Sequence, residues 1–114
     1  MTAHPTPAAR PGRERPADRR ASATSSYRFA GADFTMTVGF YADGRIAELF
    51  VNAGHANSAL DALASDAAIA ISFALQHGAD LAAIRLAMKR NSQGEPSSPI
   101  GAALAMASEM ESAP

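Results

Sequence analysis

The sequence predicts an α+β domain in which a β-hairpin is followed by three helices, and three observations predict this class. Residues 34–41 alternate strictly between apolar and polar side chains, as a half-buried strand does. An Asp-Gly pair at 43–44 separates this run from a second apolar run at 46–52, which is the strongest short signal for a hairpin. After residue 57, apolar side chains recur at helical spacing between capping residues and glycines. We expect the helices to pack on one face of the small sheet.

The chain is expected to begin with a disordered basic tail at residues 1–27, followed by one domain at residues 28–110. Residues 1–26 hold five arginines and two acids, a net charge of +3, whereas the rest of the chain carries −4. The tail has almost no large apolar side chain that folding could bury. Its arginines could bind nucleic acid or another polyanion, or the tail could be only a solubilising leader. Its prolines exclude the amphipathic helix of a mitochondrial transit peptide.

The first face of the hairpin sets its register. If Asp43 and Gly44 are the two loop residues, all the facing pairs on that side of the ribbon are apolar. The pairs are Phe40 with Ala47, Val38 with Leu49, and Met36 with Val51. A slip by one residue would place Glu48 on this face and lose the match.

The second face of the hairpin carries more large side chains than a solvent face needs. Tyr41, Ile46 and Phe50 lie there, so we expect these three residues to form an interface. Two strands alone make a poor sheet, and strand pairing with a second copy of the chain is the preferred source of further strands. A homo-oligomer or a complex with another protein is therefore expected.

A long helix is expected from Ser58 to about His77. Ser58 and Asp61 resemble a capping box, and Gly78 is the kind of residue that ends a helix. We expect its inward stripe to contain the following residues: Leu60, Leu63, Ala67, Ile71 and Ala74.

Two further helices complete the expected order. Asp80 is the predicted cap of a short helix whose inward residues are Leu81, Ile84 and Met88. After a loop, Ser98 caps a last helix with Pro99 at its first position. The expected apolar stripe of this last helix is Ile100, Ala103, Leu104 and Ala107.

Composition narrows the class of protein. The chain has no cysteine, which fits a reducing compartment, and no apolar run long enough for a membrane span or a secretory signal. A cytoplasmic protein that does not associate with membranes is expected. No Gly-rich phosphate loop, metal-ligand spacing or nucleophile motif occurs, so no metal or cofactor is expected in this chain.

Several segments in order resemble one known family, the TSCPD domain, which is found mainly at the C-terminal end of cobalamin-dependent ribonucleotide reductases. The resemblance covers about residues 36–107. It rests on a glycine turn and strand at 43–52, a helix end at 72–78 and the start of a second helix at 80–84. Where the family name spells Thr-Ser-Cys-Pro-Asp, this chain has Pro-Ser-Ser-Pro-Ile at residues 96–100.

The resemblance implies a link to ribonucleotide reduction, but this chain lacks the cysteines that carry out the reaction. Such reductases form a thiyl radical on one cysteine and draw electrons from a cysteine pair, whereas this chain has none. Adenosylcobalamin would belong only to the related reductases. The expected function is a stand-alone module, accessory or regulatory to ribonucleoside-diphosphate reductase and acting through association with a reductase subunit or with itself. A homo-oligomer with no ligand is a further possibility.

The best candidate for a ligand site is the junction between the second strand and the long helix. It holds Asn52, His55, Asn57, Ser58 and Asp61 beside a helix N-terminus, where free N–H groups and a protonated histidine could hold a phosphate or carboxylate. In the plainer interpretation, Ser58 and Asp61 only cap the helix. The alternative function is thus a nucleotide- or nucleic-acid-binding module that uses the basic tail and this helix start.

One acidic residue of the hairpin needs a partner. Glu48 lies on the second face opposite Gly39, where it could pair with Arg45 or with another chain. It has no companion base, so we do not expect it to be catalytic.

Overall fold

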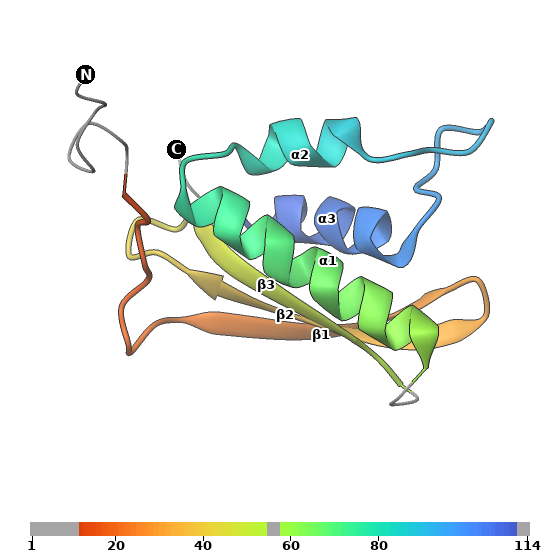
Figure 1. Cartoon of the computed structure of the whole chain (residues 1–114), viewed down its shortest axis with the longest axis horizontal. Coiled ribbons are helices and arrows are strands. Elements are labelled where there is room, and N and C mark those ends of the chain that lie inside the picture. Colours follow the sequence, from red (N-terminus) through yellow and green to blue (C-terminus); the bar gives the residue numbers. More distant parts are fainter. Residues whose placement is uncertain (1–11, 55–57, 112–114) are drawn as a thin grey trace, which may run out of the picture.

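The computed structural model describes residues 12–54 and 58–111. The strands are β1 (Ser22–Phe29), β2 (Ala32–Phe40) and β3 (Ile46–Ala53), and the helices are α1 (Ala59–Gln76), α2 (Leu81–Ala87) and α3 (Pro99–Met110). The strands form one antiparallel sheet in the order β1-β2-β3, with the helices on one face (Figure 1). α1 lies along β3, whereas α2 packs mainly against α3. The α+β class is confirmed, but the expected hairpin is a three-stranded sheet.

β1 corrects the boundary of the expected tail. Residues 22–27 fall inside the segment predicted to be disordered, yet they pair with β2 from Ser22 opposite Gly39 to Phe29 opposite Ala32. The two residues between the strands, Ala30 and Gly31, both have positive φ angles, 52° and 82°, as a two-residue hairpin turn requires. Residues 1–11 of the predicted tail lie outside the described residues.

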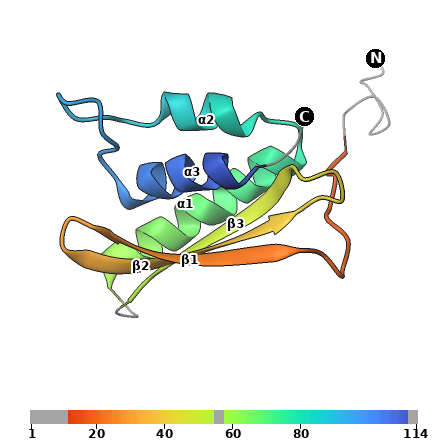
Figure 2. The same cartoon turned by 180° about the vertical axis from the view of Figure 1, so that it is seen from behind.

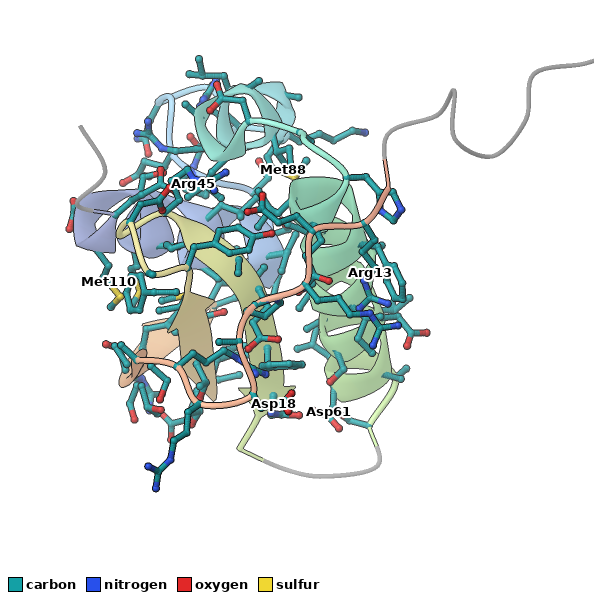
Figure 3. All side chains as sticks on the ribbon, turned by 90° about the vertical axis from the view of Figure 1, so that its left-hand side faces the viewer. Arg13, Asp18, Arg45, Asp61, Met88 and Met110 are labelled. Carbon is teal, nitrogen blue, oxygen red and sulfur yellow. The ribbon has the colours of Figure 1, made fainter. Side chains whose placement is uncertain are left out.

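Residues 12–21, the N-terminal strap, also have defined partners. The guanidinium of Arg13 lies 4.2 Å from the centroid of the Phe73 ring, and its Nε donates to Gln76 Oε1 at 2.6 Å. The N–H of Glu14 donates to Gln76 O at 2.7 Å, while its carbonyl accepts from the Tyr41 hydroxyl at 2.5 Å. Figure 3 shows Arg13 beside α1 and Arg45 at the turn between β2 and β3. The strap is thus part of the folded domain.

The turn between β2 and β3 contains the predicted Asp-Gly pair but is one residue longer than expected. Tyr41 and Arg45 close a three-residue loop, with Gly44 at a φ of 93°. The pairing of Val38 with Leu49 is confirmed, as is that of Met36 with Val51. Phe40, however, faces Ile46 instead of Ala47, because a bulge lies beside Gly39.

Two of the three predicted interface residues, Tyr41 and Ile46, are buried within the domain. Four successive residues, 46–49, are buried, and Ile46 belongs to the apolar core with 3% of its surface exposed. Tyr41 is 9% exposed, because its hydroxyl donates a hydrogen bond to Glu14 O in the strap and Arg45 lies over its ring. The exposure that motivated the interface prediction remains only at Phe50, which is 43% exposed.

α1 begins as predicted, with the Asp61 N–H donating to Ser58 Oγ at 3.0 Å, but it presents a different side to the sheet. Leu60 and Leu63 were expected inside and are 43% and 69% exposed. The buried residues are mostly small or polar: Ala64, Ala68, Ile71, Ser72, Leu75 and Gln76. Of the expected stripe, Ile71 is buried as predicted, but Leu60 and Leu63 are not, so apolar periodicity alone placed the buried side of α1 incorrectly.

The polar side chains on this buried side bond to the free edge of β3. The Leu49 N–H donates to Ser72 Oγ at 2.8 Å, and this hydroxyl lies 3.0 Å from Leu49 O. Gln76 Nε2 donates to Ala47 O at 3.0 Å. Nearer the start of the helix, Ser65 Oγ donates to Val51 O at 2.9 Å, and Asp61 Oδ1 accepts from the Ala53 N–H at 2.8 Å.

These bonds give α1 the role that a fourth strand would otherwise have. A buried backbone group without a partner is costly, so the contacts favour one position of α1 along the strand. Among the described residues, α1 is also the one helix whose length and composition would suit a membrane span. Its hydrogen bonds to β3 make it a structural part of this domain.

α3 matches its prediction. The Gly101 N–H donates to Ser98 Oγ at 3.0 Å, Pro99 opens the helix, and its core-facing residues include Ala103, Leu104 and Ala107, all 0% exposed. Beyond its end, Glu111 Oε2 accepts from the Ile46 N–H at 2.9 Å. In α2, Asp80 holds the predicted capping position, but its side chain makes no capping hydrogen bond.

Candidate functional site

In the predicted ligand site at the start of α1, two of the described polar side chains, Ser58 and Asp61, bond within the domain. Ser58 caps the helix, and the Asp61 carboxylate accepts a hydrogen bond from β3. Asn52 is exposed, with its Oδ1 3.4 Å from Ser65 Oγ. His55 and Asn57 lie outside the described residues. The carboxylate in the first turn opposes an anion there, and anion binding by this group stays a prediction.

Glu48 has a partner that the sequence analysis did not name. Its Oε2 accepts from Arg20 Nε at 2.5 Å, and the residue is only 8% exposed. Gly39 makes room for this carboxylate, because a Cβ at residue 39 would clash with Glu48 Oε2. The ion pair therefore fixes the strap against the sheet and gives Glu48 a structural role.

Arg45 makes its ion pairs at the turn, not with Glu48. Its Nε is 2.8 Å from an Asp43 oxygen, and its terminal nitrogen is 3.4 Å from Glu14. Hydrogen bonds from the backbone and side chain of Arg45 hold the pKa of Asp43 below its usual value. These groups stabilise the turn, and within residues 12–54 and 58–111 no cluster of three acidic or histidine side chains could hold a metal ion.

The surface with the clearest binding character is an apolar groove between the first half of α1 and the start of α3. We call it the α1/α3 groove; its volume is about 260 Å³ and its walls are Leu60, Leu63, Ala64, Ala67, Ser98, Pro99 and Ile100. Nearly all of its lining is apolar. Such a surface suits an apolar side chain of another protein better than a charged ligand.

Sequence reasoning missed this groove because it assigned Leu60 and Leu63 to the core. A signal was present, since α1 has large apolar residues on more sides than one buried stripe requires. Ile69 and Phe73, each 46% exposed, lie on another part of α1. A single isolated leucine, Leu86, is 61% exposed on α2.

Comparison with known proteins gives the relationship of the chain. Residues 6–110 match the TSCPD domain family. Over 75 residues the chain is 35% identical to a vitamin B12-dependent ribonucleotide reductase from Rhodopirellula baltica (strain DSM 10527 / NCIMB 13988 / SH1). This stretch is 66% of the chain but only 7% of the reductase. No solved structure matches. Because the family match covers nearly the whole chain, this protein belongs to the TSCPD domain family.

Proposed function

We propose that this domain serves ribonucleotide reduction as an accessory or regulatory module and acts by binding a reductase subunit. The observation that carries the proposal is its similarity to a vitamin B12-dependent ribonucleotide reductase in a chain that has no cysteine. A reductase needs thiols for its radical and for its electrons, so the contribution of this chain is association, with catalysis left to the partner.

The α1/α3 groove is the surface that we assign to this partner. One wall is formed by Ser98 to Ile100, the segment that stands where the family has its naming motif. The other wall contains Leu63, whose side chain gains most from being covered because it is 69% exposed. Burial of apolar area at a central pocket is the usual source of affinity in a protein interface.

The test is direct binding between the purified full chain and the purified ribonucleotide reductase of the same organism, measured by isothermal titration calorimetry. Leu63→Glu places a charge in the groove, so we expect its affinity to fall at least about tenfold, which corresponds to roughly 1.4 kcal/mol. Deoxynucleotide pools in cells lacking the gene should also change.

Leu86→Glu is the matched control, because Leu86 is also an exposed helical leucine but lies outside the groove. It should bind the reductase like the unmodified chain. Equal loss of affinity in both variants would contradict the assignment of the groove. A failure of the unmodified chain to bind, together with unchanged deoxynucleotide pools, would contradict the function itself.

A further inference from the structure

Within residues 12–54 and 58–111, no other segment pairs with the outer edge of β1. Phe40 N–H donates to Ala21 O, so the odd-numbered residues of β1 direct their backbone groups toward β2. The backbone groups of Ser22, Thr24, Ser26 and Arg28 therefore point away from the sheet. Among the described residues, none of the hydrogen bonds outside the strand ladders involves these backbone groups. Figure 2 shows β1 at one edge of the sheet.

β1 also lacks the features that usually protect an edge strand. It has no proline, no lysine and no bulge over its eight residues. Its one charged residue, Arg28, is paired with Asp33 at 2.6 Å. An unprotected edge of this length is a site for pairing with another strand.

The apolar core is incomplete at the same edge. On the helix-facing side of β2, Phe34, Met36 and Val38 are at most 1% exposed. On β1 the corresponding side chains of Ala23, Tyr27 and Phe29 contact the core but are only half-buried. A further strand beyond β1 would cover them, whereas the edge at β3 is already covered by α1.

We propose that the outer edge of β1 binds the same edge of a second copy of this chain in an antiparallel pair, joining two three-stranded sheets into one. The size and charge of the side chains favour a second copy. With the two-fold axis at Ser25, small residues face large ones: Ala23 faces Tyr27 of the second copy, and Ala21 faces Phe29. No two like charges are directly opposite, since Arg28 faces Ser22.

This register also satisfies the exposed backbone groups. Thr24 faces Ser26 of the second copy, and Ser22 faces Arg28, so each outward-pointing residue meets another. The pairing forms roughly eight backbone hydrogen bonds, two for each facing pair. The interface is the same patch on both copies, as two-fold symmetry requires. The assembly needs only this chain and does not depend on the proposed reductase link.

The first experiment is sedimentation equilibrium of the full chain at micromolar concentrations, where we expect a dimer. Ser26→Pro removes an N–H group that points outward and is not needed by β2, so this variant should remain folded and dissociate at least about tenfold more readily. Thr37→Lys, on the central strand, is the control and should still dimerise. A native chain that stays monomeric, or a Ser26→Pro variant that dimerises normally, would overturn the proposal.

A second variant covers the case in which Ser26→Pro does not fold. Because the chain has no cysteine, Ser25→Cys introduces a single thiol at the proposed two-fold axis. Facing residues that do not share hydrogen bonds are close enough for a disulfide, so mild oxidation should yield a covalent dimer. Ser92→Cys, on an exposed loop, should cross-link far more slowly. Equal cross-linking of the two variants, or none at Ser25→Cys, would show that β1 is not the interface.

Discussion

β1 and β3 are both eight-residue edge strands of the same sheet, but only the outer backbone groups of β3 are bonded by a helix. Five backbone groups of β3 find partners in the side chains of Asp61, Ser65, Ser72 and Gln76 on α1. The matching groups of β1 point outward. A helix can thus finish a sheet edge with polar side chains, and an edge without such a helix is left available for another chain.

The largest loss of stability should come from removing a side chain of α1 that bonds to the outer edge of β3. Ser72→Ala removes the acceptor of the Leu49 N–H and leaves that group buried without a partner. We expect the free energy of unfolding to fall by about 2 to 3 kcal/mol, measured by urea denaturation monitored by circular dichroism.

Ser108→Ala is the control for this change. The Ser108 hydroxyl donates only to Leu104 O of its own helix, so its loss should cost less than about 1 kcal/mol. A Ser72→Ala loss no larger than the Ser108→Ala loss would mean that the helix does not stabilise the β3 edge in the way described.

Raising the pH should remove the hydrogen bond that the side chain of Tyr27 on β1 makes to α3. The Tyr27 hydroxyl donates to Pro99 O at 2.8 Å, and burial raises the pKa of Tyr27 to about 12. The unfolded chain loses this proton near pH 10, earlier than the folded one. The stabilisation is therefore complete below pH 10 and lost as the pH rises toward 12.

The measurement is the free energy of unfolding from urea curves between pH 8 and pH 11.5. The unmodified chain should lose stability across this window more steeply than Tyr27→Phe. Part of the slope will persist in the variant, because the pKa of Tyr41 is also raised. Parallel profiles for the two proteins would show that Tyr27 does not report on the β1 side of the core.

The smallest effect belongs to the exposed face of the sheet. Thr24 Oγ1 and Thr37 Oγ1 share a hydrogen bond of 2.9 Å between β1 and β2, open to water. Thr24→Val keeps a β-branched side chain, so the free energy of unfolding should change by no more than about 0.5 kcal/mol. A loss comparable to that of Ser72→Ala would erase the difference between the two strands.

The sequence predicted the turn-forming and capping features well because they depend on neighbouring residues. The Asp-Gly turn, the Ser58 and Ser98 caps and the Pro99 helix start are all in place. The sequence analysis missed β1 because Ser22–Phe29 is rich in serine and threonine and has few large apolar residues, although it precedes a turn at Ala30 and Gly31. The low hydrophobicity of this segment hid a strand whose side chains alternate regularly between the two faces of the sheet.

The orientation of α1 and the location of the groove could not be predicted from apolar periodicity. That pattern assumes that the largest apolar side chains face the core, whereas small residues let α1 approach β3 closely enough for hydrogen bonds. Ser72 and Gln76 are buried because of the backbone groups they bond, not because of their hydrophobicity. Leu63 is consequently displaced outward, and the groove follows from that displacement.

Both ends of the described chain meet at the turn between β2 and β3, where Glu14 contacts Tyr41 and Glu111 accepts from Ile46. Any polypeptide attached before or after the domain would thus leave from a single pole. Leu60 lies near the start of α1, about 24 Å along the helix from Gln76, where the strap is fastened. A tethered protein and a protein seated in the α1/α3 groove would therefore lie toward opposite ends of α1.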